Sequence, residues 1–204
     1  VLSHVKELNL ESLSNVYRKV DEIPFDFTRR RMSVVVEDNN GKRQIITKGA
    51  VEEMLGICAY AELGGEVRPL TGDIRMRAQK FVGEMNNQGM RVLALAHKSF
   101  LSKENNFAVE DEQEMVLIGY LAFLDPPKES AAQAIRQLHG HGVEVKVLSG
   151  DNDAVVKTIS RQVGIDTSTA VTGPELEKMN EEEKMKAVAV GNIFSKLTPM
   201  QKVE

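Results

Sequence analysis

Near residue 116 the pattern of apolar residues changes, and this change constrains the fold more than any other feature of the sequence. Before it, strand-like and helix-like segments follow one another without strict alternation; after it, continuous apolar runs alternate with helical segments. Buried strands separated by helices are typical of a parallel sheet that is covered on both faces. We therefore predict two domains, residues 1–115 and 116–204, each long enough to bury a core of its own.

The first region is predicted to form an antiparallel sheet backed by helices. Its candidate strands are the apolar runs at residues 32–37, 43–48 and 91–98. Asn39-Asn40-Gly41 separates the first two runs with residues that are typical of a hairpin turn. One helix is predicted at residues 49–61, and a second is predicted to begin at a capping Asp73 and to end at Gly89.

The second region predicts a parallel sheet with helices, so that the chain as a whole is of the mixed α/β (α+β) class. Apolar runs predict strands at residues 116–124, 143–149, 170–173 and 191–197. The segments between them predict helices at residues 129–140 and 153–164 and a Glu-rich helix from about residue 180.

Composition excludes several classes of protein. A net charge of −4 and an isoelectric point near 5.7 provide no concentrated positive charge for nucleic acid, so no nucleic-acid partner is expected. No run reaches the roughly 18 apolar residues of a membrane helix, and the segment is expected to be soluble. The single cysteine, Cys58, is interpreted as a small core residue. Because the sequence begins with Val1, we expect it to be a segment of a longer protein.

Ser149-Gly150-Asp151-Asn152 follows a predicted strand and precedes a predicted helix. In sheets of this type, ligands bind beyond the carboxyl ends of the strands, where N–H groups of the next helix point outward. The segment has two interpretations. In one, Gly150 makes the turn while Asp151 or Asn152 caps the helix. In the other, the Ser149 hydroxyl and the Gly150 N–H contact a phosphoryl group, with Asp151 near its counter-ion.

Asp125-Pro126-Pro127-Lys128 follows the preceding strand at the same edge. Two prolines cannot extend a sheet, so the strand must stop there and the chain must bend. One interpretation of the segment is a rigid hinge, and a further interpretation is that Asp125 and Lys128 also orient a nucleotide. Lys202, which ends the last predicted strand, would reach this edge as a point charge for phosphate if Ser149 is a phosphate ligand.

In the first region, IPFDFTRRRMSVVV places Phe25 and Phe27 beside three arginines at residues 29–31. An aromatic ring before a strand is either part of the core or a stacking platform for a base. Adjacent arginines are either a solvated strand start or a phosphate site. Lys48 adds a cation at a strand end, next to Gly49, which permits close approach of a ligand to the backbone.

Several motifs are absent from the sequence. There is no G-x-x-x-x-G-K-S/T loop, no G-x-G-x-x-G and no Cys/His spacing of a metal site, so no metal-binding residues are predicted. No Ser/His/Asp order can be defended, and no nucleophile is identified.

Six segments, in this order, resemble the cytoplasmic part of P-type cation-transporting ATPases. They are IPFDFTRRRMSV, KGAVEEML, QGMRVLALA, FLDPPKE, VLSGDN and KLTPMQK, and they span nearly the whole chain after residue 20. IPFDFTRRRMSVVV and GYLAFLDPPKE are most similar to the bacterial magnesium-transporting branch.

The resemblance implies a nucleotide-binding domain, residues 1–115, inserted into a haloacid-dehalogenase-like phosphorylation domain, of which residues 116–204 are a part. It implies that Phe25 stacks on adenine, that Arg30 and Lys48 line the nucleotide pocket, and that Arg91 approaches the phosphates.

In the second domain the resemblance assigns Asp125 and Lys128 to the family's D-P-P-K/R hinge. Ser149, Gly150 and Asp151 match its T-G-D segment, and Ser149 keeps the hydroxyl of the commoner threonine. Lys202 matches a lysine that grips phosphate, so that Ser149 and Lys202 would make the phosphoryl contacts.

The resemblance further implies a cytoplasmic portion of a bacterial plasma-membrane transporter with ATP and Mg²⁺ as cofactors. The whole protein would couple ATP hydrolysis, through an aspartyl-phosphate, to transport of a cation, Mg²⁺. Its transmembrane and actuator domains would be the partners of this segment.

Two of the family's strings do not occur here: D-K-T-G-T, which holds the phosphorylated aspartate, and T-G-D-G-x-N-D, which binds magnesium. The family's acidic contact to the adenine amino group also has no assigned residue. We therefore expect this segment to bind ATP weakly and not to turn it over.

Two alternatives remain open at this stage. A free-standing haloacid-dehalogenase-like phosphatase with a cap domain would need an early aspartate nucleophile, and the first 27 residues match D-x-D-x-T/V poorly. A non-catalytic nucleotide-binding scaffold would keep the fold without the chemistry.

Overall fold

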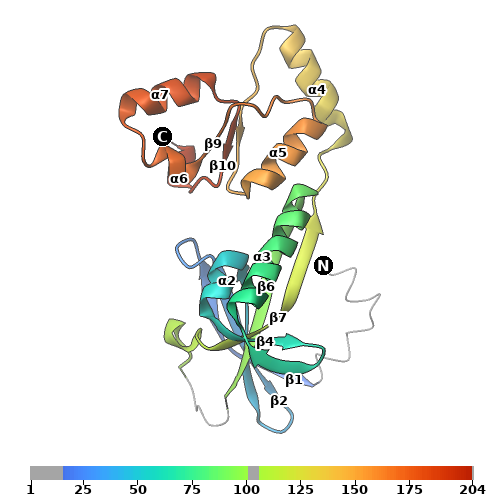
Figure 1. Cartoon of the computed structure of the whole chain (residues 1–204), viewed down its shortest axis with the longest axis vertical. Helices are drawn as coiled ribbons and strands as arrows, with labels where there is room; N and C mark the ends of the chain where they lie inside the picture. Colours follow the sequence, from blue (N-terminus) through green and yellow to red (C-terminus); the bar gives the residue numbers. More distant parts are fainter. Residues whose placement is uncertain (1–15, 101–105, 204) are drawn as a thin grey trace. The chain divides into compact units, whose positions relative to one another are not determined.

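A computed structural model describes residues 16–100 and 106–203 and divides the chain into two compact units (Figure 1). The first unit comprises the chain up to Ala78 together with Leu93–Leu121. The second comprises Gln79–Val92 together with the chain from Ala122 onward. These units are defined by compactness, whereas the predicted domains, residues 1–115 and 116–204, are defined by the sequence pattern. The domain boundary near residue 116 therefore stays a prediction.

The first unit is built on a seven-stranded sheet with the order β1-β2-β3-β6-β7-β4-β5. Its strands are β1 (Tyr17–Asp26), β2 (Arg31–Asp38), β3 (Arg43–Ala50), β4 (Cys58–Leu63), β5 (Glu66–Pro69), β6 (Met90–Phe100) and β7 (Met115–Leu124). The pairs β1–β2, β2–β3, β3–β6 and β4–β5 are antiparallel, whereas β4 and β7 are parallel. The predicted antiparallel sheet is confirmed, and β1, β4 and β5 are strands that the sequence pattern did not predict.

The predicted hairpin between β2 and β3 is confirmed. Gly41 has a φ of +75°, a left-handed conformation that glycine adopts without a steric penalty. The Asp38 carboxylate accepts hydrogen bonds from the backbone N–H groups of Asn40 (2.9 Å) and Lys42 (2.8 Å). Along both strands, alternate residues are buried on one face, as expected of a sheet with one side on the core.

Helix α2 (Val51–Ile57) is shorter than the helix predicted at residues 49–61. Cys58 instead begins β4, whose backbone pairs with β5 and β7, and this pairing overrides the helical pattern of the sequence. The Arg75 guanidinium donates to the carbonyls of Leu55 and Cys58 and so satisfies acceptors at the end of α2. Cys58 is buried, which confirms its interpretation as a core residue.

Helix α3 (Gly72–Asn87) begins one residue before the predicted cap, so Asp73 lies in the first turn instead. There its negative charge interacts favourably with the positive end of the helix dipole. The chain leaves the helix at Gly89, whose φ is +83°, as the sequence pattern predicts. A short 3₁₀ helix, η2 (Val109–Asp111), precedes β7.

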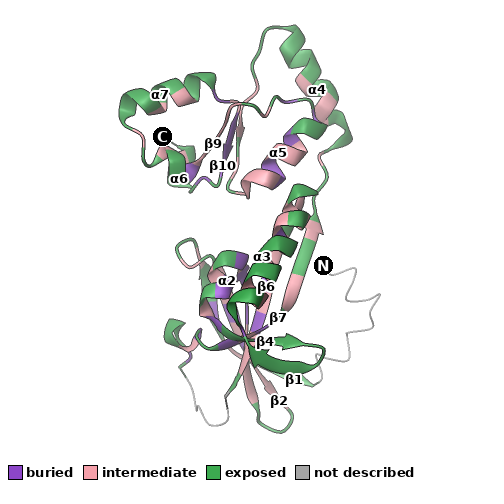
Figure 2. Cartoon of the chain, in the orientation of Figure 1, coloured by how far each residue is buried: buried purple, intermediate pink, exposed green. Residues whose placement is uncertain are grey.

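The core of the first unit lies where the sheet meets α2 (Figure 2). Its fully buried side chains include Val35, Ile45, Met54, Ala94 and Met115.

The second unit contains a small parallel sheet with the order β8-β10-β9. Its elements are β8 (Val147–Leu148), β9 (Ala170–Thr172), β10 (Ile193–Ser195), α4 (Glu129–Gly140), α5 (Asp153–Gln162), α6 (Gly173–Leu176), α7 (Glu181–Val190) and a 3₁₀ helix, η3 (Met200–Lys202). Its core is formed by Val156, Val163, Ile165 and Ile193. The predicted parallel arrangement and helices are confirmed, although β8 and β10 are shorter than the apolar runs that predict them.

Strand β7 was predicted as the first strand of the parallel sheet, and this assignment is wrong. The structure places β7 in the seven-stranded sheet, beside β6 and β4. Its continuous apolar sequence is compatible with burial in either sheet, so the pattern alone could not choose between them. The strand ends at Leu124, directly before the Asp125-Pro126-Pro127 segment, as two prolines require.

The fold class is therefore mixed α/β, with a large, mainly antiparallel sheet and a small parallel one, as predicted. Among the residues that the structure describes, none of the helices is both long and apolar enough to cross a membrane.

Candidate functional site

One end of the seven-stranded sheet carries the residues predicted to contact a nucleotide in the first unit. Phe25, Arg30 and Lys48 are sequence neighbours of three residues that face one another across adjacent strands: Asp26 of β1, Arg31 of β2 and Gly49 of β3. The strand register thus brings an aromatic ring and two cations to the same end of the sheet.

Two phenylalanine rings are exposed at this end. The exposed fraction is 49% for Phe25 and 72% for Phe27, and their ring centroids lie 5.3 Å apart at an interplanar angle of 85°. This edge-to-face arrangement is favourable for aromatic pairs. Large apolar side chains exposed together, here at the end of β1 and in the loop that follows it, are more typical of a binding surface than of a core.

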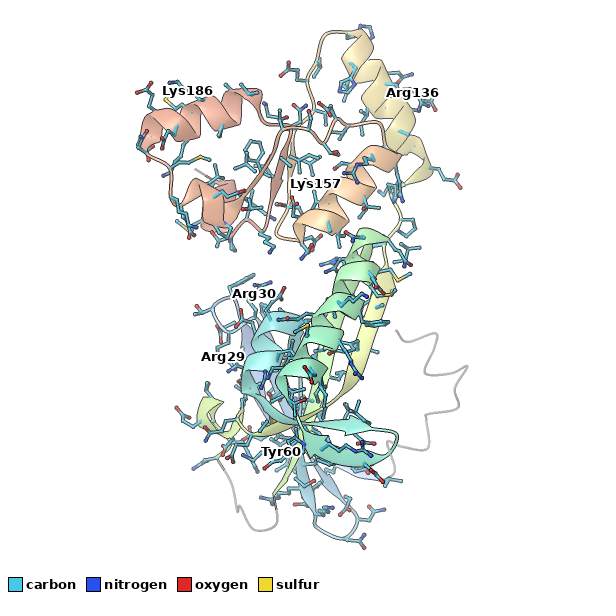
Figure 3. All side chains as sticks on the ribbon, viewed as in Figure 1. Arg29, Arg30, Tyr60, Arg136, Lys157 and Lys186 are labelled. Atoms are coloured by element: carbon cyan, nitrogen blue, oxygen red, sulfur yellow. The ribbon has the colours of Figure 1, made fainter. Side chains whose placement is uncertain are left out.

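The three arginines at residues 29–31, at the junction between β1 and β2, have different environments. Figure 3 labels Arg29 and Arg30. Arg29 and Arg31 are largely buried and make ion pairs with Glu112. The Arg30 side chain is half exposed, and its ion pair with Glu53 is long, at 3.7 Å. Of the three, Arg30 therefore offers the most accessible charge, and its role as a ligand-binding residue stays a prediction.

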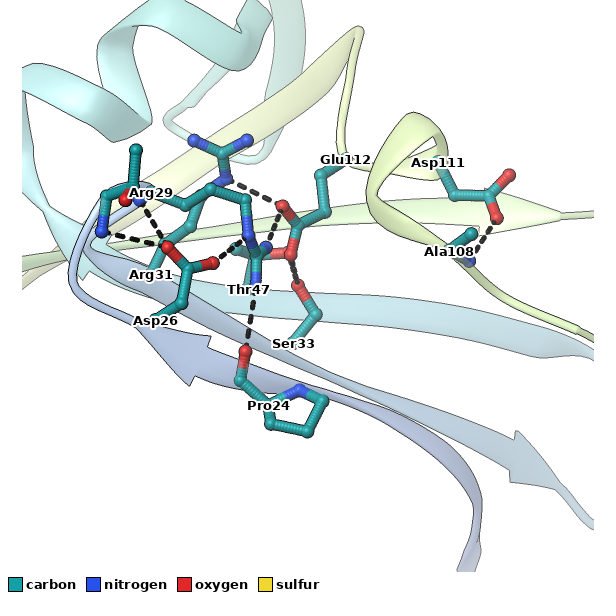
Figure 4. Close-up of polar contacts among 10 residues, drawn as sticks. Pro24, Asp26, Arg29, Arg31, Ser33, Thr47, Ala108, Asp111 and Glu112 are labelled. Atoms are coloured by element: carbon teal, nitrogen blue, oxygen red, sulfur yellow. Dashed lines mark hydrogen bonds and ion pairs between the residues drawn. The ribbon is translucent and has the colours of Figure 1, made fainter.

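Glu112 lies just after η2 and is buried, and Figure 4 shows its partners. Its Oε2 accepts from Arg29 Nη1 (2.6 Å) and Arg31 Nε (2.7 Å), and its Oε1 accepts from Ser33 Oγ (2.7 Å). Burial acts to raise the pKa of this carboxyl group, but the hydrogen bonds from Arg29, Ser33 and Arg31 outweigh burial and hold the pKa below its ordinary value.

The same loop is closed by Asp26. Its Oδ1 accepts from the backbone N–H groups of Thr28 (2.9 Å) and Arg29 (2.7 Å), and its Oδ2 accepts from the Arg29 side chain. The backbone N–H of Arg29 is the main reason that the pKa of Asp26 lies below its ordinary value. The N–H of Arg30 donates to the Asp26 carbonyl at 2.9 Å. The loop is thus a hydrogen-bonded structure rather than a loose connection.

The structure requires a glycine at position 49 for a reason that differs from the predicted approach of a ligand. A Cβ at this position would lie 2.5 Å from the Cβ of Arg31 and 2.8 Å from the carbonyl oxygen of Arg30. The close backbone approach that Gly49 permits is therefore that of β2. Ala50 continues the contact by donating its N–H to the Arg30 carbonyl at 3.0 Å. Lys48, one residue earlier, is exposed.

In the second unit, the Ser149–Asn152 turn uses polar groups for its own structure. Asn152 Oδ1 accepts from the Ala154 N–H (2.9 Å) and caps α5, and Ser149 Oγ accepts from the Asp151 N–H (3.1 Å). The first interpretation of this turn, with Asn152 as the cap, is confirmed. Because the Ser149 hydroxyl is the acceptor in its bond, it keeps its own hydrogen for a ligand.

The loops that follow β8 and β10 are fastened together at the carboxyl edge of the small sheet. The Leu197 N–H donates to the Ser149 carbonyl (3.0 Å), and the Lys196 N–H donates to the Asp151 carbonyl (2.9 Å). A Cβ on Gly150 would lie 3.2 Å from the Leu197 carbonyl oxygen, so a side chain there would be crowded. Backbone hydrogen bonds therefore fix this edge, and Ser149 and Asp151 lie there with partly buried side chains.

Arg91 lies at the start of β6, within the stretch Gln79–Val92 that belongs to the second unit, and it is paired with Asp151. Arg91 Nη2 and Asp151 Oδ1 are 3.0 Å apart, and both side chains are partly exposed. An ion pair with this exposure contributes about 1 kcal/mol or less to stability. A ligand that binds either partner would therefore lose little free energy by breaking this ion pair.

Asp125, Lys128 and Lys202 are all exposed. Asp125 follows β7, and Lys128 is the N-cap residue of α4, where its side chain makes no capping bond. Lys202 was predicted at the end of the last strand, and this placement is wrong because β10 ends at Ser195 and Lys202 lies in η3. The hydrogen-bonded loop after β10 leaves the strand direction before Lys202 is reached.

Within the described part of the chain, no three or more His, Cys, Asp or Glu side chains form a group that could hold a metal ion. The sequence pattern did not single out Glu112, which lies in the polar run SKENNFAVEDEQE among several other acids. No local signal distinguishes it, because its partners lie about 80 residues earlier in the chain.

Comparison with known proteins places these observations in context. Residues 1–130 match the family model described as P-type ATPase, cytoplasmic domain N. The Magnesium-transporting ATPase, P-type 1, of Escherichia coli (strain K12) is 39% identical over 202 residues, which cover 99% of this chain and 22% of that protein.

Two further relatives have similar coverage. A Magnesium-transporting ATPase, P-type 1, of Salmonella typhimurium (strain LT2) is 46% identical over 187 residues, which cover 90% of this chain and 21% of that protein. The Calcium-transporting ATPase lmo0841 of Listeria monocytogenes is 33% identical over 184 residues, or 89% of this chain and 21% of that protein. The chain spans about a fifth of the length of these relatives.

Proposed function

The chain belongs to the P-type ATPase family, and from this membership we propose that its first unit binds ATP. The observation that carries the proposal is the end of the sheet where the exposed ring of Phe25, near the end of β1, lies beside Phe27 and the accessible Arg30 of the following loop. Lys48 lies on β3, which pairs with β2. A nucleotide has a flat base that stacks on aromatic rings and phosphates that attract cations. Both requirements are met by neighbouring residues.

In the proposed complex, adenine stacks on the Phe25 ring, and the Phe27 ring provides a second aromatic surface against the adenine. Arg30 and Lys48 line the pocket and face the phosphates. Arg29 and Arg31 do not contact the nucleotide, because their hydrogen bonds to Glu112 occupy them. The proposed site depends on a loop whose backbone is held by hydrogen bonds, so little conformational entropy is lost on binding.

In the second unit we propose a phosphoryl-contact surface at the carboxyl edge of the small sheet. Ser149 donates its hydroxyl hydrogen to a phosphoryl oxygen, and the Gly150 N–H, Arg91 and Lys202 add positive potential. Asp125, Lys128 and Asp151 are proposed to orient the nucleotide and its counter-ion. The position of Ser149 and Gly150 beyond a parallel strand supports this arrangement.

The phosphorylated aspartate is proposed to lie in the part of the parent protein outside this sequence, since D-K-T-G-T does not occur here. Mg²⁺ would arrive with ATP and neutralise phosphate charge. The contribution of this chain is then to position the nucleotide and stabilise charge, and not to supply the nucleophile. We therefore expect the isolated chain to form no aspartyl-phosphate.

For the whole protein, we propose ATP-driven transport of Mg²⁺ across a bacterial plasma membrane, with this chain on the cytoplasmic side. The names of the magnesium-transporting relatives and their higher identity, compared with the calcium-transporting one, support Mg²⁺ as the cargo. Transmembrane and actuator domains of the same protein would be its partners.

The test is a titration of the chain with a non-hydrolysable ATP analogue, followed by amide NMR. We expect shifts that saturate at Phe25, Phe27, Arg30 and Lys48. An Arg30→Gln variant should bind less tightly, whereas Arg18→Gln, on the opposite end of the β1–β2 pair, serves as the control for loss of a surface arginine. A titration without shifts at this loop would refute nucleotide binding and favour a scaffold role.

A further inference from the structure

The buried carboxylate of Glu112 is the starting point of a separate inference. Of the described residues that are buried and polar, Glu112 alone carries an ionisable group; the others are serines and a threonine. A buried carboxylate is unfavourable unless charges and hydrogen bonds compensate its lost hydration. Among the residues that the structure describes, the compensation comes from Arg31 and Ser33 of β2 and from Arg29 in the loop that precedes it.

The partners of Glu112 flank the exposed residues of that loop. Arg29 donates from one side of Arg30 and Arg31 from the other, so a single carboxylate oxygen joins the two ends of the turn. Ser33 donates to the second oxygen and also shares a hydrogen bond with Thr47 of β3 at 2.7 Å. Glu112 therefore connects η2, β2 and β3 behind the loop.

Arg29 extends this connection to the aromatic segment. Besides Glu112, its guanidinium donates to the Pro24 carbonyl at 2.7 Å and to the Asp26 carboxylate. Pro24 and Asp26 are the two sequence neighbours of Phe25, so the backbone on both sides of that residue is held through Arg29. Burial acts to lower the pKa of Arg29, but the hydrogen bonds to Glu112 and Asp26 outweigh burial and raise it, which keeps the side chain charged.

Arg30 is held in a conformation that needs such support. Its φ is +49°, in the left-handed region that residues with a Cβ seldom adopt. Arg30 is nevertheless exposed, so the strain is maintained by contacts of its neighbours rather than by packing of its own side chain.

We propose that Glu112 is a positioning residue that does not touch the ligand. Through Arg29 and Arg31 it fixes the loop of residues 24–31, so that Phe25, Phe27 and Arg30 face a nucleotide. This inference rests on the proposed function of the first unit and adds to it a residue that acts through Arg29 and Arg31. Removing one partner of a buried ion pair leaves the remaining charges uncompensated. Neutralising the carboxylate should therefore release Arg29 and Arg31 and lower the order of the loop, and it should also lower the stability of the unit.

The test compares Glu112→Gln with Glu37→Gln. Glu37 provides a matched control because its carboxylate also accepts from two arginines, Arg18 (2.8 Å) and Arg43 (2.6 Å), at the opposite end of β2. Each variant removes one negative charge with almost no change of shape. The readouts are amide order parameters of residues 24–31 without nucleotide, and the dissociation constant of a non-hydrolysable ATP analogue.

For Glu112→Gln we expect lower order parameters in the loop and binding weakened by about tenfold, as expected when a preorganised site must be ordered by its ligand. Glu37→Gln should leave both values as in the unmodified chain. If Glu112→Gln does not fold, Arg29→Lys provides the second variant, because a lysine keeps the charge but cannot reach three acceptors in the same geometry.

The inference is overturned if Glu112→Gln, or Arg29→Lys in its place, leaves the loop as ordered as in the unmodified chain, or if Glu37→Gln disorders the loop equally. Failure of the proposed function has a different signature. In that case the unmodified chain would not bind the analogue, while the order parameters would still decide whether Glu112 fixes the loop.

Discussion

Replacing Gly49 by alanine should disrupt the contact between β2 and β3 at the candidate nucleotide site. The new Cβ would lie 2.5 Å from the Cβ of Arg31, 2.9 Å from its Cα and 2.8 Å from the carbonyl oxygen of Arg30. Carbon atoms in favourable contact are about 3.5–4.0 Å apart. The two strands would therefore have to separate by about 1 Å, which stretches the hydrogen bond between Ala50 and Arg30.

The cost of such overpacking is about 1–3 kcal/mol. For a unit of this size, a loss of about 2 kcal/mol corresponds to a fall in Tm of roughly 8–16 °C. The assay is thermal unfolding followed by circular dichroism, together with titration of the ATP analogue. Nucleotide affinity should fall as well, because Arg30 moves with the strand.

Gly56→Ala is the matched control. Gly56 is an exposed residue of α2, and a Cβ there would meet no atom within 4 Å. Because alanine is a better helix former, this variant should be neutral or more stable by up to about 1 kcal/mol. A Gly49→Ala variant as stable as the unmodified chain would refute the explanation given for Gly49.

Three further predictions concern other parts of the chain. Asn152→Ala removes the cap of α5 and should lower the free energy of unfolding by about 1 kcal/mol in urea titrations, and an unchanged value would contradict the capping role. Burial raises the pKa of the Cys58 thiol to about 11, so a thiol reagent at pH 8 should react with it only after unfolding in urea; rapid reaction of the folded chain would show that the thiol is accessible. The pKa of Glu112 is lowered in the folded state, so its contribution to stability is present above its ordinary pKa of 4.5 and is lost as the pH falls through the folded-state pKa. The free energy of unfolding of Glu112→Gln, measured in urea, should therefore depend less on pH in that acidic range than that of the unmodified chain. Equal pH dependence of the two would exclude this linkage.

Local patterns in the sequence were sufficient for much of the fold. The turn at Asn39–Gly41, the strands on either side of it and the end of β7 before two prolines all follow from residues a few positions apart. Strand β1 escaped prediction because its sequence, YRKVDEIPFD, carries charges and a proline. Among the described strands, β1 is an edge strand that pairs with β2. The helix predicted at residues 49–61 failed for a similar reason, since pairing with distant β7 decides that β4 is a strand.

The candidate site was predictable in its residue types but not in their roles. The run Arg29-Arg30-Arg31 indicated positive charge. Only the long-range contacts with Glu112 distinguish the two largely buried arginines from the accessible Arg30. Gly49 was recognised as a point of close approach, but the approaching group is β2. The roles of these residues depend on which strands become neighbours in the sheet. Local patterns in the sequence do not reveal which strands pair.

The most direct test of the central claim is an intermolecular NOE measurement on the chain bound to an ATP analogue. We predict cross-peaks between the adenine H2 or H8 protons and the ring protons of Phe25 and Phe27, with a weaker set in Glu112→Gln at the same nucleotide concentration. A bound nucleotide whose adenine protons contact other residues, and neither of these rings, would contradict the proposed site.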